Sequence, residues 1–90
     1  MSHTTKNKDK LIARIRRLKG QMEAIERALE AEAPCTEVLN QVASVRGAIN
    51  GLTAELIEDH IHEHVLGVED PAAREAGARQ LIDVIRTYMK

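Results

Sequence analysis

The sequence predicts an all-α fold, a three-helix protomer in which two long helices form an antiparallel hairpin and a short C-terminal helix follows. Two stretches carry apolar residues at alternating steps of four and three, a spacing that one side of a helix presents and a strand cannot. Pro34 and the pair Asp70-Pro71 stand where helices are expected to begin, because proline at a first helical position lacks only an N–H that would be unbonded anyway.

The two long helices are predicted from their apolar stripes. The first is expected from about residue 6 to residue 31, after an N-terminal arm of residues 1–5, and its stripe consists of Leu11, Ile15, Leu18, Met22, Ile25 and Leu29. The second is expected from about residue 34 to residue 66, and Gly67 ends it. Its stripe consists of Val38, Val42, Val45, Ile49, Leu52 and Leu56. Because the two stripes match, they predict a hairpin.

The third helix is expected from about residue 71 to residue 89, with Asp70 as its N-cap. Its apolar face is less regular than the other two and consists of Leu81, Val84, Ile85 and Tyr88. We expect this helix to cover the end of the hairpin that carries the histidines. Residues 1–90 are therefore expected to form one domain.

The composition favours an oligomer. Ninety residues are close to the size at which a lone hydrophobic core becomes marginal, and the aromatic content is 1%, a single Tyr88. We therefore expect the protomer to form an oligomer, which would bury further apolar surface. A single cysteine, with no membrane span and no signal peptide, indicates a reducing cytoplasm.

The formal net charge of −1 hides an asymmetry along the chain. Residues 1–20 carry seven basic side chains against Asp9 alone, a net charge of +6, whereas the other residues carry six basic and thirteen acidic side chains, a net charge of −7. A basic block on an otherwise acidic protein indicates a local surface for a polyanion. A solvated helix with a chance bias would give the same count.

Three cations share one flank of the first helix. Lys10, Arg14 and Arg17 are spaced i, i+4 and i+7, which places them on the same side of a helix. DNA phosphates are the expected partner of this flank. Arg46 stands among apolar residues of the second helix, where it either pairs with a carboxylate or faces the same anion.

The chain's cysteine and two of its histidines lie at opposite ends of the second helix. His60 and His64 are spaced i, i+4, so both rings can hold one metal ion. Cys35 lies in the first turn, where the helix dipole favours a thiolate, but it is roughly 37 Å from His60 at 1.5 Å per residue. An antiparallel pair of these helices from two chains would bring Cys35 of one chain to His60 and His64 of the other.

Two glycines and two further histidines bear on this arrangement. Gly47 and Gly51 lie near the midpoint between the two ends of the site, where close approach of two backbones would need small residues. His3 lies near the N-terminal amine, with which it could bind a metal. His62 points about 160° away from the other pair, so we expect it to face solvent or to lie behind the ligands.

No constellation of catalytic residues is present, so an enzyme is not expected.

The alternatives to a metal site are ordinary structural roles. A lone cysteine is more often a small buried hydrophobe than a ligand, and a single H-x-x-x-H spacing is a weak signal. A helical interaction module that senses nothing is the reading that composition alone favours.

Nearly the whole chain resembles the RcnR/CsoR/FrmR family of small all-α bacterial transcriptional repressors. The resemblance rests on Arg14 to Gln21 (RIRRLKGQ), the position of Cys35, Gln41 to Leu52 (QVASVRGAINGL), and His60 after an acidic pair. It implies that the protomer dimerises into a four-helix bundle and that two such dimers assemble as a tetramer, with the sensor site between subunits. It also implies repression by the metal-free protein, through a DNA surface formed by Lys10, Arg14, Arg17 and Arg46 of several subunits, and release of double-stranded operator DNA when the effector binds.

Four sensor positions separate the effectors in this family, and here they are His3, Cys35, His60 and His64. The resemblance implies the set of the nickel/cobalt sensors, with Ni(II) or Co(II) as effector and release of metal efflux or resistance genes from repression. Zn(II) would also suit a set of one cysteine and histidines. Copper(I) sensors have a second cysteine where this chain has His64, and Cu(I) favours more thiolate than one cysteine supplies.

Formaldehyde sensors of the family are the alternative. They keep the cysteine and the first histidine but typically have proline at position 2 and a carboxylate at position 64, where this chain has Ser2 and His64. Cys35 and the N-terminal amine could nevertheless condense with formaldehyde. A repressor that responds to formaldehyde therefore stays open beside the metal sensor.

Overall fold

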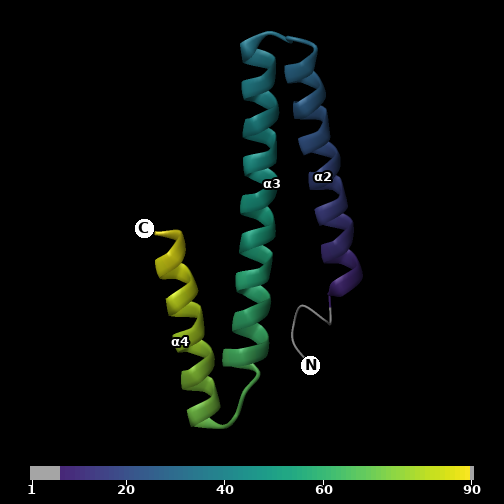
Figure 1. Ribbon diagram of the computed structural model, residues 1–90. Helices are drawn as coiled ribbons and strands as arrows, with labels where there is room; N and C mark the ends of the chain where they lie inside the picture. The colour runs from purple at the N-terminus through teal and green to yellow at the C-terminus, as the bar shows by residue number, and fades with distance from the viewer. Residues whose placement is uncertain (1–6, 90) are drawn as a thin grey trace. The chain divides into compact units, whose positions relative to one another are not determined.

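The computed structural model describes residues 7–89, which form three α-helices and a π-helical turn (Figure 1). In chain order these elements are α2 (Lys8–Glu30), α3 (Cys35–Ile61), the π-helix η1 (His62–Leu66) and α4 (Pro71–Tyr88). No strand occurs in the described part of the chain, so the predicted three-helix, all-α fold class is confirmed. No helix among these residues is long and apolar enough to cross a membrane.

The chain divides into two compact units, and the boundary falls within α3. One unit is Asn7–Thr53, which contains α2 and most of α3. The other begins at Ala54 and contains the end of α3, η1 and α4. Each unit has its own packing.

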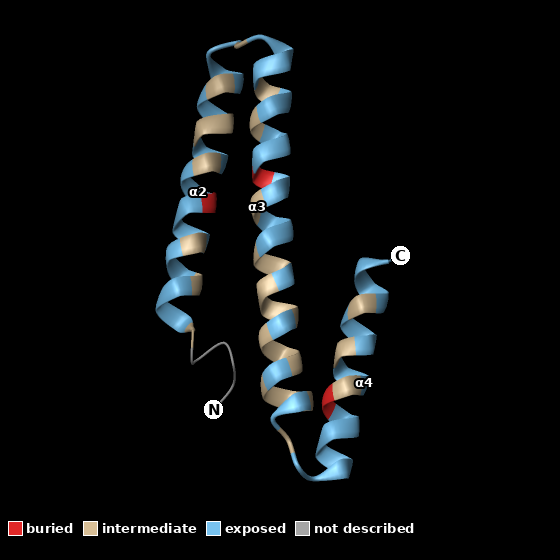
Figure 2. Cartoon of the chain, turned by 180° about the vertical axis from the view of Figure 1, so that it is seen from behind, coloured by how far each residue is buried: buried red, intermediate tan, exposed pale blue. Residues whose placement is uncertain are grey.

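In Asn7–Thr53, α2 and α3 lie side by side and antiparallel (Figures 1 and 2). A narrow seam of apolar side chains lies between them. Leu18 and Val45, each 9% exposed, are the buried apolar side chains of the described residues. Half-buried residues seven positions before and after each of them extend the seam, namely Leu11, Ile25, Val38 and Leu52. A seven-residue repeat keeps the seam on one side of each helix.

The alternate residues of each predicted stripe stay exposed, except Leu56, which is half-buried. Between 44% and 61% of the surface of these residues is accessible, and we call them the apolar flank: Ile15, Met22, Leu29, Val42 and Ile49. At about 100° per residue, this flank lies to one side of the seam on both helices. Within the chain, therefore, only about half of each stripe packs in the seam, and the apolar flank remains accessible to a second copy.

The α2–α3 connection is a Schellman turn. Glu32 adopts the left-handed conformation (φ 55°), the N–H of Ala33 donates to the carbonyl of Ala28 (2.9 Å), and the N–H of Glu32 donates to the carbonyl of Leu29 (3.1 Å). Pro34 precedes α3 instead of occupying its first position, because its carbonyl accepts the first helical hydrogen bonds. Cys35 is consequently the first residue of the helix.

In the second unit, α4 begins where the sequence predicts. Asp70 is the N-cap, its side chain accepts a hydrogen bond from the N–H of Ala73 (3.2 Å), and Pro71 is the first helical residue. The guanidinium of Arg74 donates to the carbonyl of Val68 through Nε (3.0 Å) and Nη2 (2.9 Å). These bonds fix the start of α4 next to the end of η1.

A charge placed on the apolar flank should prevent assembly. We expect Ile49→Asp to shift the protein to a smaller species at micromolar concentration, because an unpaired carboxylate would be buried in any interface formed by this flank. Size-exclusion chromatography with light scattering measures the mass. Asn40→Asp adds the same carboxylate at an exposed polar position of α3 and should leave the mass unchanged. Equal masses for Ile49→Asp and the unaltered chain would contradict an interface on this flank.

Candidate functional site

The two spaced histidines of the second unit lie next to each other. The ring centroids of His60 and His64 are 4.8 Å apart, and the rings are tilted by 44°. His60 belongs to the last turn of α3, and His64 belongs to η1. Both are half-buried, whereas His62 is exposed. The structure therefore brings together His60 and His64 and leaves His62 facing solvent.

A hydrogen bond to α4 orients the His60 ring. Its Nε2 lies 2.8 Å from the carbonyl oxygen of Gly77. A carbonyl can only accept, so Nε2 carries the hydrogen, and in the neutral ring Nδ1 then carries the lone pair that a metal ion would need. Metal-binding histidines usually donate their second ring N–H in this way. The pair thus fits a metal ion that prefers imidazole nitrogen.

Gly77 is also the point at which α4 contacts His64. It is the buried residue of α4, and a side-chain carbon built on it would overlap the carbonyl oxygen of His64. The carbonyl carbon and Cβ of His64 would lie 2.9 and 3.0 Å from that carbon. Both histidines therefore contact the same residue of α4.

The remaining predicted ligands are not part of this pair. Cys35 is exposed and belongs to the other unit, and His3 lies outside the described residues. Across residues 7–89, no three His, Cys, Asp or Glu side chains are close enough to hold a metal ion. A complete site would need ligands beyond this pair, and a site shared between chains stays a prediction.

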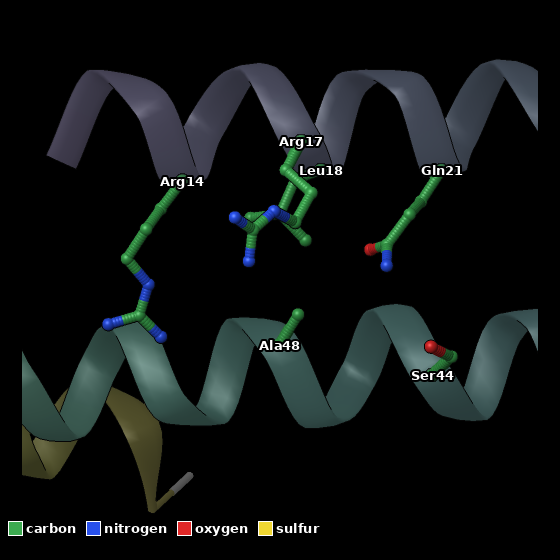
Figure 3. Close-up of a pocket in the computed structure, with 6 residues that line it drawn as sticks. All are labelled: Arg14, Arg17, Leu18, Gln21, Ser44 and Ala48. Carbon is green, nitrogen blue, oxygen red and sulfur yellow. The ribbon is translucent and has the colours of Figure 1, made fainter. Parts of the chain in front are cut away.

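The basic flank of α2 borders a groove. Figure 3 shows Arg14 and Arg17 extending from α2 toward α3, beside a cavity of about 270 Å³. Arg14 is half-buried, and its Nη2 would lie 2.9 Å from a side-chain carbon built on Gly51. Gly51 thus gives space to an arginine of its own chain, whereas a side-chain carbon built on Gly47 would meet no described atom within 4 Å beyond its chain neighbours and the adjacent backbone of its own helix. Lys10 is exposed on the same flank of α2.

Polar residues continue this groove. Gln21 and Ser44 line both the first cavity and a second one of about 190 Å³, which Gln41 also borders. The Oε1 atoms of Gln21 and Gln41 are buried and accept no hydrogen bond from the described residues. Among those residues, no acidic side chain lines either cavity. The groove, on the side of the seam opposite the apolar flank, is therefore cationic and has unmet hydrogen-bonding capacity.

Arg46 does not line this groove. It follows Ser44 by two residues, which places it about 200° farther around α3. Arg14, Arg17 and Arg46 therefore do not form one surface within a single chain. A DNA surface that uses all of them needs more than one copy.

Sequence reasoning missed three residues of these regions. Gly77 has no local signature, because its role depends on contacts with the preceding element. Gln21 and Ser44 occupy ordinary positions on polar helix flanks. The lack of aromatic residues and the presence of small residues near Ser44 could have indicated a groove. They could not have indicated which residues line it.

Comparisons with known proteins define the class. Residues 7–87 match the family model of metal-sensitive transcriptional repressors. The chain is 40% identical over 90 residues to the transcriptional repressor RcnR of Salmonella paratyphi B, with both chains covered completely. The chain therefore belongs to the CsoR/RcnR family of metal-sensitive transcriptional repressors, whose members act on transcription and are not enzymes.

Two further relatives add detail. A protein of Serratia marcescens, described as an uncharacterized protein in the bioA 5′ region, is 52% identical over 91 residues, and both chains are covered completely. A solved structure is similar with a TM-score of 0.82 and 42% identity, and covers 92% of this chain and 94% of that one. It is a variant of the formaldehyde-responsive regulator FrmR from Salmonella enterica serovar Typhimurium in which histidine replaces a glutamate.

Proposed function

We propose that this repressor acts in the cytoplasm, binds operator DNA in its metal-free form and releases the DNA on binding Ni(II) or Co(II). Release would derepress genes for metal efflux or resistance. The proposed ligands are His3 and Cys35 with His60 and His64, contributed by different chains. The observation that carries this proposal is the adjacent pair of imidazoles, with the lone pair of His60 on Nδ1. Imidazole and a single thiolate suit Ni(II), Co(II) and Zn(II) better than Cu(I).

The position of Cys35 supports a site between chains. Cys35 precedes Val45 by ten residues, which places it about 80° around α3 from the seam, on the side of the apolar flank. A second copy that packs against that flank would therefore lie next to the exposed thiol. We propose that the pair of chains forms a four-helix bundle and that two such pairs form the tetramer.

The DNA side of the proposal rests on the groove. Lys10, Arg14 and Arg17 supply positive charge on one flank of α2, and Arg46 of another subunit would add to the surface. Such cations bind mainly phosphates, so they position the protein on the duplex. Metal binding between chains would change the spacing of these cations, and by linkage the DNA-bound protein must bind the metal less tightly.

A second candidate is a repressor that responds to formaldehyde. The similarity to FrmR and the exposed thiol of Cys35 favour it. The thiol would add to formaldehyde to give a hydroxymethyl thioether, and the N-terminal amine would then displace water to form an S–CH2–N bridge. This chemistry requires Cys35 but neither His60 nor His64 as a metal ligand.

DNA binding separates the candidates. We expect a duplex from the region upstream of the coding sequence to bind the metal-free protein and to be released by Ni(II) or Co(II), but not by formaldehyde. Fluorescence anisotropy with Ni(II), Co(II), Zn(II), Cu(I) and formaldehyde measures release. Release by formaldehyde alone would establish the second candidate. No DNA binding and no metal binding would leave a helical interaction module.

The histidines should differ in their effect on cobalt binding. We expect His64→Ala to weaken Co(II) binding at least about tenfold, because a ligand is removed, whereas His62→Ala should change it less than about twofold. Cobalt absorption in the visible and near-ultraviolet measures both affinity and thiolate ligation. Cys35→Ala should abolish the thiolate-to-cobalt band. Equal affinities for the two histidine variants would rule out the proposed pair.

Arg17 should contribute to the salt dependence of DNA binding. We expect Arg17→Ala to weaken binding about tenfold and to lower the slope of log K against log salt by about 0.9 for each phosphate that the variant no longer neutralises. Arg16→Ala removes the same charge from an exposed position on the side of α2 away from α3, so its slope should change less. Matching slopes for the two variants would show that the groove does not bind phosphate.

A further inference from the structure

We infer that Gly77 is the positioning residue of the histidine pair: its carbonyl holds the His60 ring through Nε2, so that Nδ1 is the nitrogen that would bind the metal, and its missing side chain lets α4 reach the backbone of His64. This inference rests on the proposed metal-sensing function for the role of Nδ1. The contacts themselves, His60 Nε2 to the Gly77 carbonyl and Gly77 to the His64 carbonyl, belong to the metal-free chain.

The local backbone does not require a glycine at position 77. Gly77 lies inside α4, between Ala76 and Ala78, and none of the described glycines has a positive φ. Glycine is a poor residue for a helix interior because it loses more conformational freedom than alanine does. The contact with His64 supplies the reason, because even a methyl group would overlap the His64 carbonyl oxygen.

The same carbonyl can serve both the helix and the histidine. A backbone carbonyl has two lone pairs, so the Gly77 oxygen can accept from the helical N–H four residues later and from His60 Nε2. The 2.8 Å separation is that of a good N–H···O bond. It holds the ring in one tautomer, which a solvent-exposed histidine would not maintain.

The contacts at the start of α4 fix the position of Gly77 relative to the two histidines. Asp70 caps the helix, and Arg74 binds the Val68 carbonyl through two nitrogens one turn before Gly77. The short connection after Gly67 is thus held at both ends, since the N–H of Gly67 donates to the His62 carbonyl (2.9 Å). The approach of Gly77 to both histidines is set by these bonds.

The first measurement uses the unaltered, metal-free full chain. Long-range ¹H–¹⁵N correlation spectra distinguish the two histidine tautomers, and the His60 signals are assigned by their disappearance in His60→Asn. We expect His60 to carry its hydrogen on Nε2. A hydrogen on Nδ1, or equal exchange between the two, would overturn the inference, and it would not bear on whether the protein senses metal.

The second measurement compares Gly77→Ala with a matched control. We expect Gly77→Ala to lose the fixed His60 tautomer and to weaken Co(II) binding by about 10- to 100-fold, the range seen when a partner behind a metal ligand is removed. Gly20→Ala makes the same change in a helix interior where the added carbon would meet no described atom within 4 Å beyond its chain neighbours and the adjacent backbone of its own helix. It should keep both the tautomer and the affinity.

A third variant covers failure of Gly77→Ala to fold. Arg74→Gln leaves Gly77 intact but cannot bind the Val68 carbonyl through a fork, so it should weaken Co(II) binding several-fold and broaden the His60 signals. Gly77→Ala that folds, keeps the tautomer and binds Co(II) within twofold of the unaltered chain would overturn the inference. A different combination separates the two proposals. If Gly77→Ala loses the fixed His60 tautomer but the unaltered chain does not bind Co(II), the positioning by Gly77 is upheld and the proposed function is refuted.

Discussion

The packing of α2 against α3 within Asn7–Thr53 is the constraint that determines which surfaces of this unit are apolar and which are cationic. The seam around Leu18 and Val45 buries one apolar position per seven residues of each helix, so the neighbouring apolar position stays exposed. Burial of apolar surface contributes about 25 cal/mol per Å², which gives the exposed flank a substantial tendency to associate. The groove with Arg17 lies on the opposite side of the same seam. The proposed association through the apolar flank would therefore leave the cationic groove open to DNA.

The unit that contains the histidine pair depends on three local features instead. A π-helical turn replaces the α-helix over His62–Leu66, and such turns are rare and often found at functional sites. The cap and the Arg74 fork start α4 immediately afterwards. Gly77 then approaches the turn more closely than any other residue type could. The result is a histidine pair whose geometry exists in the metal-free chain, so a metal bound as proposed would find these ligands already ordered, which lowers the cost of binding.

Much of the fold could be predicted from the sequence because the spacing of apolar residues and the residues that cap a helix are local features. The four-three stripes predict the helices, and Asp70-Pro71 predicts the start of α4. The stripes cannot show which half packs within the chain, because both halves are equally apolar. The position of Gly51 predicts an approach between two chains, yet Arg14 of its own chain uses that space. The i, i+4 spacing predicts the histidine pair, but Gly77 depends on how α4 docks, which no local pattern encodes.

The proposed division of the metal site between chains has a consequence for sensing. If Cys35 and the histidine pair belong to different chains, the site exists only in the assembled protein, so the metal stabilises the assembly and its affinity rises with protein concentration. Arg17 and Arg46 lie on different sides of one chain, so a DNA surface that uses both depends on the spacing between chains. A metal ion that ties two chains together fixes that spacing. Metal and DNA then compete through the relative placement of subunits, although neither ligand touches the other, and the coupling must act equally in both directions.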